Sequence, residues 1–178
     1  MSVDKFFTLK DGRAIFIREV FVEDAERLHE FYLKVTSETE FLVTLPEEVL
    51  DVASERNLIR IYRSSHNRLY LVAFYSSQII GALKLAGNRR KRMSHVAELS
   101  IAVKKDFWGL GVGSILMKEA INWAKSHEIK RIELTVLDNN KRAINLYNKF
   151  GFVEECRMKM ATILSDGHHD LILMAKFL

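Results

Sequence analysis

Three glycines at alternating positions constrain this chain more than any other feature. Gly109, Gly111 and Gly113 lie between His95–Val103, which has strand character, and a helical pattern over Ile115–His127. Glycine permits a positive φ and lets a ligand approach the main chain closely. The first turn of a helix has peptide N–H groups without intrahelical acceptors, at the positive end of the macrodipole. The arrangement predicts an anion site that suits a phosphate or pyrophosphate.

Two familiar phosphate-binding motifs do not fit this segment. A Walker loop needs a lysine followed by serine or threonine after the last glycine, where this chain has Ser114-Ile115. A dinucleotide-binding fingerprint needs Gly-x-Gly-x-x-Gly after a first βαβ unit, and neither is present. A glycine-rich turn without a ligand stays an alternative on this motif alone, because short glycine motifs recur by chance.

Hydrophobic periodicity predicts a mixed α/β sheet with helices on its faces. One proline, no low-complexity linker and no repeat in 178 residues favour one domain over residues 1–178. Four helices are expected. One begins at Asp24, and a second begins at Pro46 and continues through Tyr62. The other two cover Ile115–His127 and Asn140–Phe150. The strands are expected at Ala14–Val20, Leu69–Tyr75, Gln78–Ala86, His95–Val103, Arg131–Leu137, Phe152–Met160 and His169–Lys176.

A second motif follows the glycine turn by one predicted helix and one predicted strand. It begins at Asn140 and reads Asn-x-x-Ala-x-x-Leu-Tyr-x-x-x-Gly-Phe, ending at Phe152. Together and in this order, the two motifs resemble the signatures of the GNAT N-acetyltransferases. The resemblance covers about residues 13–176 and is tightest over 96–152. It implies the GNAT fold, a mostly antiparallel mixed sheet that splays between its fourth and fifth strands, here His95–Val103 and Arg131–Leu137.

The resemblance also implies that acetyl-CoA lies in the gap between those two strands. The backbone of Ile101, Ala102 and Val103 would pair with the pantetheine arm as an added strand would. Asn140 would bond to the cofactor arm, and Tyr147 would face the sulfur. The pyrophosphate would be held by backbone N–H groups of Gly109, Leu110, Gly111, Val112, Gly113 and Ser114.

The phosphate site departs from the family pattern at two positions. Trp108 stands where many members carry arginine or glutamine, and Leu110 where a basic residue is common. We therefore expect the site to depend more on backbone donors than on charge.

The reaction implied is acetyl transfer from acetyl-CoA to a primary amine of a small molecule or a protein N-terminus, by direct attack. A backbone N–H at or near Val103 would stabilise the developing oxyanion, and Tyr147 would donate a proton to the departing thiolate. Tyr147 also shares a helical face with Ala143, Leu146 and Phe150, so packing in the core is the alternative role for it. A catalytically silent acyl-CoA-binding sensor or interaction protein is the alternative function.

Glu98 is the candidate general base. It lies within the strand that leads to the glycine turn, between Ala97 and Leu99. An ionised carboxylate there is costly unless it lines a wet cavity or is paired. A structural pair with Lys84 on the neighbouring strand is the alternative to a catalytic role.

The charge distribution argues against a general nucleic-acid binder. The net charge is +4, and without the basic run Arg89–Arg92 the acidic and basic residues balance at 23 each. Eight strand residues at about 3.3 Å each separate this run from the glycine turn by roughly 26 Å. We expect a solvated hairpin tip, with an acidic protein or RNA partner as the minority interpretation.

The remaining sequence features bear on location and partners. The single cysteine, Cys156, and the lack of a long apolar run favour a cytoplasmic protein without a membrane partner. His168-His169 lacks other ligands at metal spacing, so no metal is expected. The expected partners are acetyl-CoA and an amine acceptor, with a homodimer left open.

Overall fold

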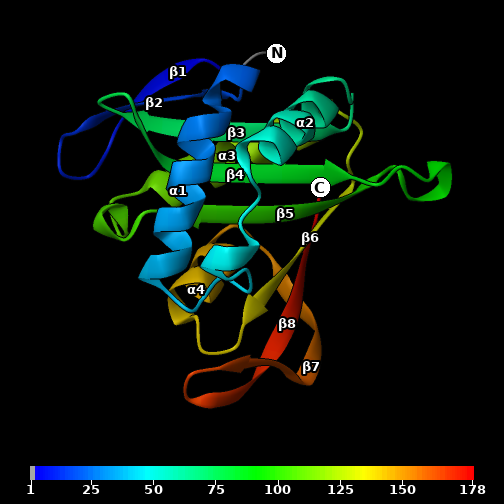
Figure 1. The fold of residues 1–178 in the computed structure, drawn as a ribbon. Coiled ribbons are helices and arrows are strands. Elements are labelled where there is room, and N and C mark those ends of the chain that lie inside the picture. Colours follow the sequence, from blue (N-terminus) through cyan, green and yellow to red (C-terminus); the bar gives the residue numbers. More distant parts are fainter. Residues whose placement is uncertain (1–2) are drawn as a thin grey trace.

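The computed structural model describes residues 3–178, whose strands form an eight-stranded mixed sheet in the order β1-β2-β3-β4-β5-β6-β8-β7 (Figure 1). Neighbouring strands are antiparallel except β5 and β6, which are parallel. The strands are β1 (Lys5–Thr8), β2 (Ala14–Glu19), β3 (Arg68–Tyr75), β4 (Gln78–Gly87), β5 (Val96–Val103), β6 (Arg131–Leu137), β7 (Val153–Leu164) and β8 (Gly167–Phe177).

Four α-helices cover the two faces of the sheet in this part of the chain: α1 (Ala25–Glu38), α2 (Val52–Arg63), α3 (Val112–Ser126) and α4 (Lys141–Lys149). Side chains alternate between the faces along each strand. In β4, Leu83 and Leu85 belong to the core that contains the buried face of α3, whereas Ala82 belongs to the core under α1 and α2. The predicted α/β class with helices on both faces is confirmed.

The splay that the resemblance implied is present and has a definite starting point. The parallel pairing of β5 with β6 covers only Val96 to Glu98, opposite Arg131 to Glu133. Beyond it, β5 stays paired with β4 as far as Val103, and β6 stays paired with β8 as far as Leu137. Each strand follows its other neighbour, and a gap opens from Leu99 onward. Figure 1 shows β6, β8 and β7 turning away from the direction of β3 to β5.

One predicted element was wrong, and one strand was missed. The helix expected to begin at Pro46 is a separate 3-10 turn over Pro46–Glu48, after which Val49 is extended. The helix α2 begins only after Asp51, whose carboxylate accepts the N–H of Ser54 at 2.7 Å and caps the first turn. The short strand β1 was not predicted, because its four residues are mostly exposed and show no clear alternation of burial.

The basic run lies at the tip of the β4–β5 hairpin, as predicted. Arg89, Arg90, Lys91 and Arg92 are exposed, and Figure 1 shows this tip extending away from the body of the sheet. It is at the far end of β5 from the glycine turn.

None of the helices that the structure describes is long and apolar enough to cross a membrane.

Candidate active site

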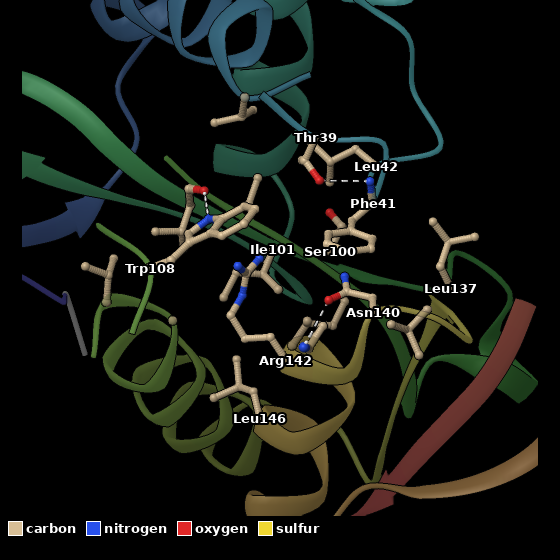
Figure 2. Close-up of a pocket in the computed structure, with 18 of the residues that line it drawn as sticks. Thr39, Phe41, Leu42, Ser100, Ile101, Trp108, Leu137, Asn140, Arg142 and Leu146 are labelled. Atoms are coloured by element: carbon tan, nitrogen blue, oxygen red, sulfur yellow. Dashed lines mark hydrogen bonds between the residues drawn. The ribbon is translucent and has the colours of Figure 1, made fainter. Parts of the chain in front are cut away.

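A cavity of about 670 Å³ opens where β5 and β6 part. One wall is β5 with the glycine turn that follows it, and the opposite wall is the end of β6 with α4 (Figure 2). The segment between α1 and α2 covers a third side with Thr39, Phe41 and Leu42. The cavity therefore joins the two sequence motifs to the loop between α1 and α2.

The hydrogen-bond pattern of the β4–β5 ladder decides which peptide groups of β5 face the gap. Lys104 N–H donates to the carbonyl of Ile80 at 2.9 Å, and at the other end Asn88 N–H donates to the carbonyl of Val96 at 3.0 Å. In an antiparallel ladder, hydrogen-bonded residue pairs such as these two alternate with pairs that exchange no hydrogen bond. The odd-numbered residues of β5 form such pairs with β4, so their peptide groups point away from β4.

Beyond the β5–β6 pairing, Ile101 and Val103 therefore present peptide groups to the gap. The carbonyl of Val103 accepts the indole N–H of Trp108 at 2.7 Å (Figure 2), and its N–H points into the gap. Ala102 differs, because its register places its own peptide groups against Ala82 of β4. Ala102 lines the cavity without offering a backbone donor to it.

The glycine turn contains two different kinds of glycine. Gly109 and Gly111 have φ values of +77° and +108°, and a Cβ at either position would meet no atom within 4 Å. Backbone conformation requires glycine there, and the space beside it is open. Gly113 is helical, and its Cβ would lie 3.2 Å from Leu146, so it allows α3 to approach α4.

The N-terminus of α3 has no side-chain cap. Gly111 is the N-cap residue, and the first helical hydrogen bond runs from Ile115 N–H to the carbonyl of Gly111 at 3.0 Å. The N–H groups of Val112, Gly113 and Ser114 consequently have no intrahelical acceptor. These residues line the cavity, so their donors and the positive end of the helix dipole are available to an anion there.

Two cations reach this end of the cavity from other parts of the chain. The guanidinium carbon of Arg142 lies 3.1 Å from the centre of the Trp108 ring (Figure 2), and burial lowers the pKa of Arg142. Lys10 lines the cavity too, and its backbone N–H donates to the carbonyl of Leu110 at 3.1 Å. Arg142 and Lys10 thus add two cations from outside the glycine motif to the lining of the cavity, and the expected dependence of the phosphate site on backbone donors stays a prediction.

Tyr147 is both packed in the core and part of the cavity wall. It is 7% exposed, and its ring lies 5.9 Å from that of Phe152. Burial raises the pKa of Tyr147 to about 12, partly offset by the charge of Arg142. The phenol therefore keeps its proton at neutral pH and can act as a donor.

Asn140 is the N-cap of α4. Its side-chain oxygen accepts the N–H of Ala143 at 3.2 Å, a contact that fixes which end of the amide is the oxygen. The amide nitrogen is directed toward the cavity (Figure 2).

Glu98 is exposed and lines the cavity. The register places it opposite Ala86, whereas Lys84 is opposite Ser100. No ion pair within 4.0 Å joins Glu98 to Lys84 in residues 3–178. The geometry favours the wet-cavity interpretation of this carboxylate over the structural pair.

Sequence reasoning missed a polar cluster at the α1–α2 side of the cavity. Glu55 of α2 is 2% exposed and accepts the hydroxyl of Tyr70 at 2.9 Å. Tyr32 and Lys84 lie beside this pair, and with Glu55 they line the cavity. The available signal was the position of Glu55, which shares a helix face with the buried Ile59 and Tyr62.

Comparisons with known proteins agree with this architecture. Residues 28–152 match the Acetyltransferase (GNAT) family, and the chain belongs to that family. A GNAT-family acetyltransferase structure from Streptococcus pneumoniae aligns with a TM-score of 0.88 at 34% identity, over 92% of this chain and 99% of that one. A Salmonella typhimurium protein assigned as an acetyltransferase and solved with acetyl-CoA shares the fold, with a TM-score of 0.82 at 18% identity, over 92% of this chain and 94% of that one.

A curated relative is similar over a shorter region. An L-amino acid N-acetyltransferase of Escherichia coli K12 is 36% identical over 110 residues, which are 60% of this chain and 66% of that protein.

Among residues 3–178, no group of three or more His, Cys, Asp or Glu side chains is arranged to hold a metal ion.

Proposed function

We propose that the protein transfers the acetyl group of acetyl-CoA to a primary amine. The observation that carries the proposal is the set of peptide groups at Ile101 and Val103, which face a gap leading directly to the uncapped N-terminus of α3. An extended arm could add to β5 in that gap as a strand does. Its anionic end would then meet the first-turn donors of α3.

The cavity residues fit such a ligand along its length. The pyrophosphate would be held by Arg142, Lys10 and the cavity-lining residues of the glycine turn, which are Gly109, Gly111, Val112, Gly113 and Ser114. Leu110 of the same turn does not line the cavity and packs against the core. The amide nitrogen of Asn140 would bond to the arm. Bound acetyl-CoA supplies a thioester carbonyl that an amine can attack, releasing the CoA thiolate. Cys156 is exposed on β7 and is not part of the cavity wall, which supports direct attack by the amine over an acyl-cysteine step.

Three groups of the chain would assist the reaction. The N–H of Val103 would donate to the carbonyl oxygen as negative charge develops on it. The Tyr147 hydroxyl, which keeps its proton because of its raised pKa, would protonate the departing sulfur. Glu98 would take up the proton of the ammonium group directly or through water.

A thiol-release assay with acetyl-CoA and a panel of amines tests the proposal. We expect release of free CoA that depends on the amine, together with a product heavier by one acetyl group in mass spectrometry. Tight acetyl-CoA binding without thiol release for any amine would contradict it and favour a silent acyl-CoA binder.

A further inference from the structure

The cavity continues past the gap into a polar compartment under α1 and α2. Its wall contains Tyr32, Glu55, Lys84, Glu98 and Ser100. No step of the proposed mechanism uses Lys84, Glu55 or Tyr32. A charged, half-buried cluster at the acceptor side of the cavity therefore calls for a separate explanation.

Glu55 is already engaged by a tyrosine pair. The hydroxyl of Tyr70 lies 2.9 Å from Glu55 Oε1 and 3.1 Å from the hydroxyl of Tyr32. Burial raises the pKa of Glu55, and the hydrogen bond from Tyr70 and the charge of Lys84 only partly offset this effect. Glu55 thus anchors the tyrosines, and α2 holds it almost completely out of solvent.

Lys84 has no comparable anionic contact. Its ammonium lies 5.0 Å from the centre of the Tyr32 ring and 5.7 Å from that of Tyr70. No carboxylate is within 4.0 Å of it in the described part of the chain. Burial lowers the pKa of Lys84, but Tyr32, Glu55 and Tyr62 outweigh it and raise the pKa overall. Lys84 is therefore a protonated cation with hydrogen-bonding capacity at the cavity wall.

The register fixes how far this cation is from the acyl end of the gap. Lys84 pairs with Ser100, and both side chains lie on the same face of the sheet as Ala102. Ala102 is two positions beyond Ser100, about 7 Å along the strand. A lysine side chain can span part of that distance, so a group bound by Lys84 would lie close to the attacking nitrogen.

Accepting the proposed acetyl transfer, we propose that Lys84, with the exposed Ser100, forms a subsite for a carboxylate on the acceptor. The acceptor would then be a small amine that carries a carboxylate near its amino group, as an α-amino acid does. An amine without a carboxylate would exclude water from the Lys84 ammonium without supplying an anionic acceptor, and only the more distant charge of Glu55 would offset that loss, which makes the subsite discriminating.

The test compares Lys84→Met, which keeps the length of the side chain and removes its charge, with Lys91→Met at the exposed β4–β5 hairpin tip. The substrates are L-amino acids, their carboxamides and the corresponding decarboxylated amines. For the wild type we expect kcat/KM at least ~30-fold higher for the best amino acid than for its carboxamide, the range that loss of a paired buried charge gives. In Lys84→Met this preference should fall to within ~3-fold, while Lys91→Met should keep it.

A binding measurement separates this inference from the proposed function. Calorimetric titration of the same amino acid and its carboxamide into the protein with CoA should show binding of the amino acid that Lys84→Met weakens by ~30-fold or more. If the protein bound the amino acid in preference to its carboxamide but showed no turnover, the transfer reaction would be overturned and the subsite would be supported. Equal wild-type binding and turnover of acid and carboxamide, or equal losses for both in Lys84→Met, would overturn the subsite. Unchanged acetyl-CoA affinity and thermal unfolding of the variant would exclude a folding defect.

Discussion

The guanidinium of Arg142 stacks on the indole of Trp108, with 3.1 Å between the guanidinium carbon and the ring centre. Trp108 follows β5, and Arg142 is in the first turn of α4, after β6. The contact thus spans the opening between the two parted strands (Figure 2). The indole N–H also donates a hydrogen bond to the carbonyl of Val103, which holds the ring against the end of β5. The cation is positioned by an aromatic face rather than by a carboxylate, so its charge is available to a ligand phosphate.

Replacing Arg142 with alanine should weaken acetyl-CoA binding by about 10- to 100-fold, the effect of losing one charge-assisted contact. Titration calorimetry measures the change, with Lys141→Ala on the exposed side of the same helix turn as the control. The loss should vanish with acetyl-pantetheine, which lacks the pyrophosphate. An equal loss with that short thioester would mean that Arg142 acts on the acyl end instead.

Replacing Tyr147 with phenylalanine should lower kcat by about 100-fold or more through loss of a proton donor, with little change in acetyl-CoA affinity. Because the pKa of Tyr147 is about 12, its deprotonation should cause no decline in the wild-type kcat/KM between pH 6 and about 10. Steady-state kinetics across that range test both statements. A variant with the full wild-type rate would reduce Tyr147 to a packing residue.

Gly111→Ala should weaken acetyl-CoA binding by about 10-fold or more and destabilise the fold by about 1–2 kcal/mol, because φ at this residue is +108°. Gly167→Ala is the matched control, since Gly167 has φ of +127°, open space around it and no place in the cavity wall. It should show a similar loss of stability with unchanged affinity. Calorimetry and urea unfolding measure the two quantities, and equal affinities in both variants would refute the position of the phosphate site.

Asp24→Asn should destabilise the protein by about 3 kcal/mol, because it leaves the half-buried Arg18 without its partner. Asp24 is 2% exposed and accepts two bonds from Arg18, at 2.6 and 2.8 Å, and one from the N–H of Phe21. Burial raises the pKa of Asp24, but these bonds outweigh it and lower the pKa below 3.8.

The sign of the pH effect follows from that lowered pKa. The stabilisation by Asp24 is fully present above the unfolded value and is lost as the pH falls through the folded pKa. Urea unfolding at pH 7 and pH 3 should show a smaller difference between wild type and Asp24→Asn at the lower pH. Asp11→Asn, which removes a more exposed pair with Arg13, should cost much less than Asp24→Asn, because solvent screens exposed ion pairs.

Sequence patterns predicted the features that depend on local periodicity and glycine. The strand β6 has the bounds expected for it, and the glycine turn lies between β5 and α3 as predicted. The start of α2 was misplaced, because Asp51 and Pro46 are both acceptable helix starts and only packing decides between them. Side-chain contacts between distant segments, such as Arg142 with Trp108 or Glu55 with Tyr70, leave no local signal. The contact of Arg142 with Trp108 depends on tertiary structure, because the splay of β5 and β6 determines how α4 lies relative to the glycine turn.

Titration calorimetry with acetyl-CoA tests the central claim most directly, because the claim is that the gap beyond Leu99 is a binding site for a pyrophosphate-bearing thioester. We predict saturable binding of one acetyl-CoA per chain, and affinity at least about 100-fold weaker for acetyl-pantetheine, which cannot reach the first-turn donors of α3. No measurable heat and no thermal stabilisation with acetyl-CoA or any other acyl-CoA at millimolar concentration would contradict the account.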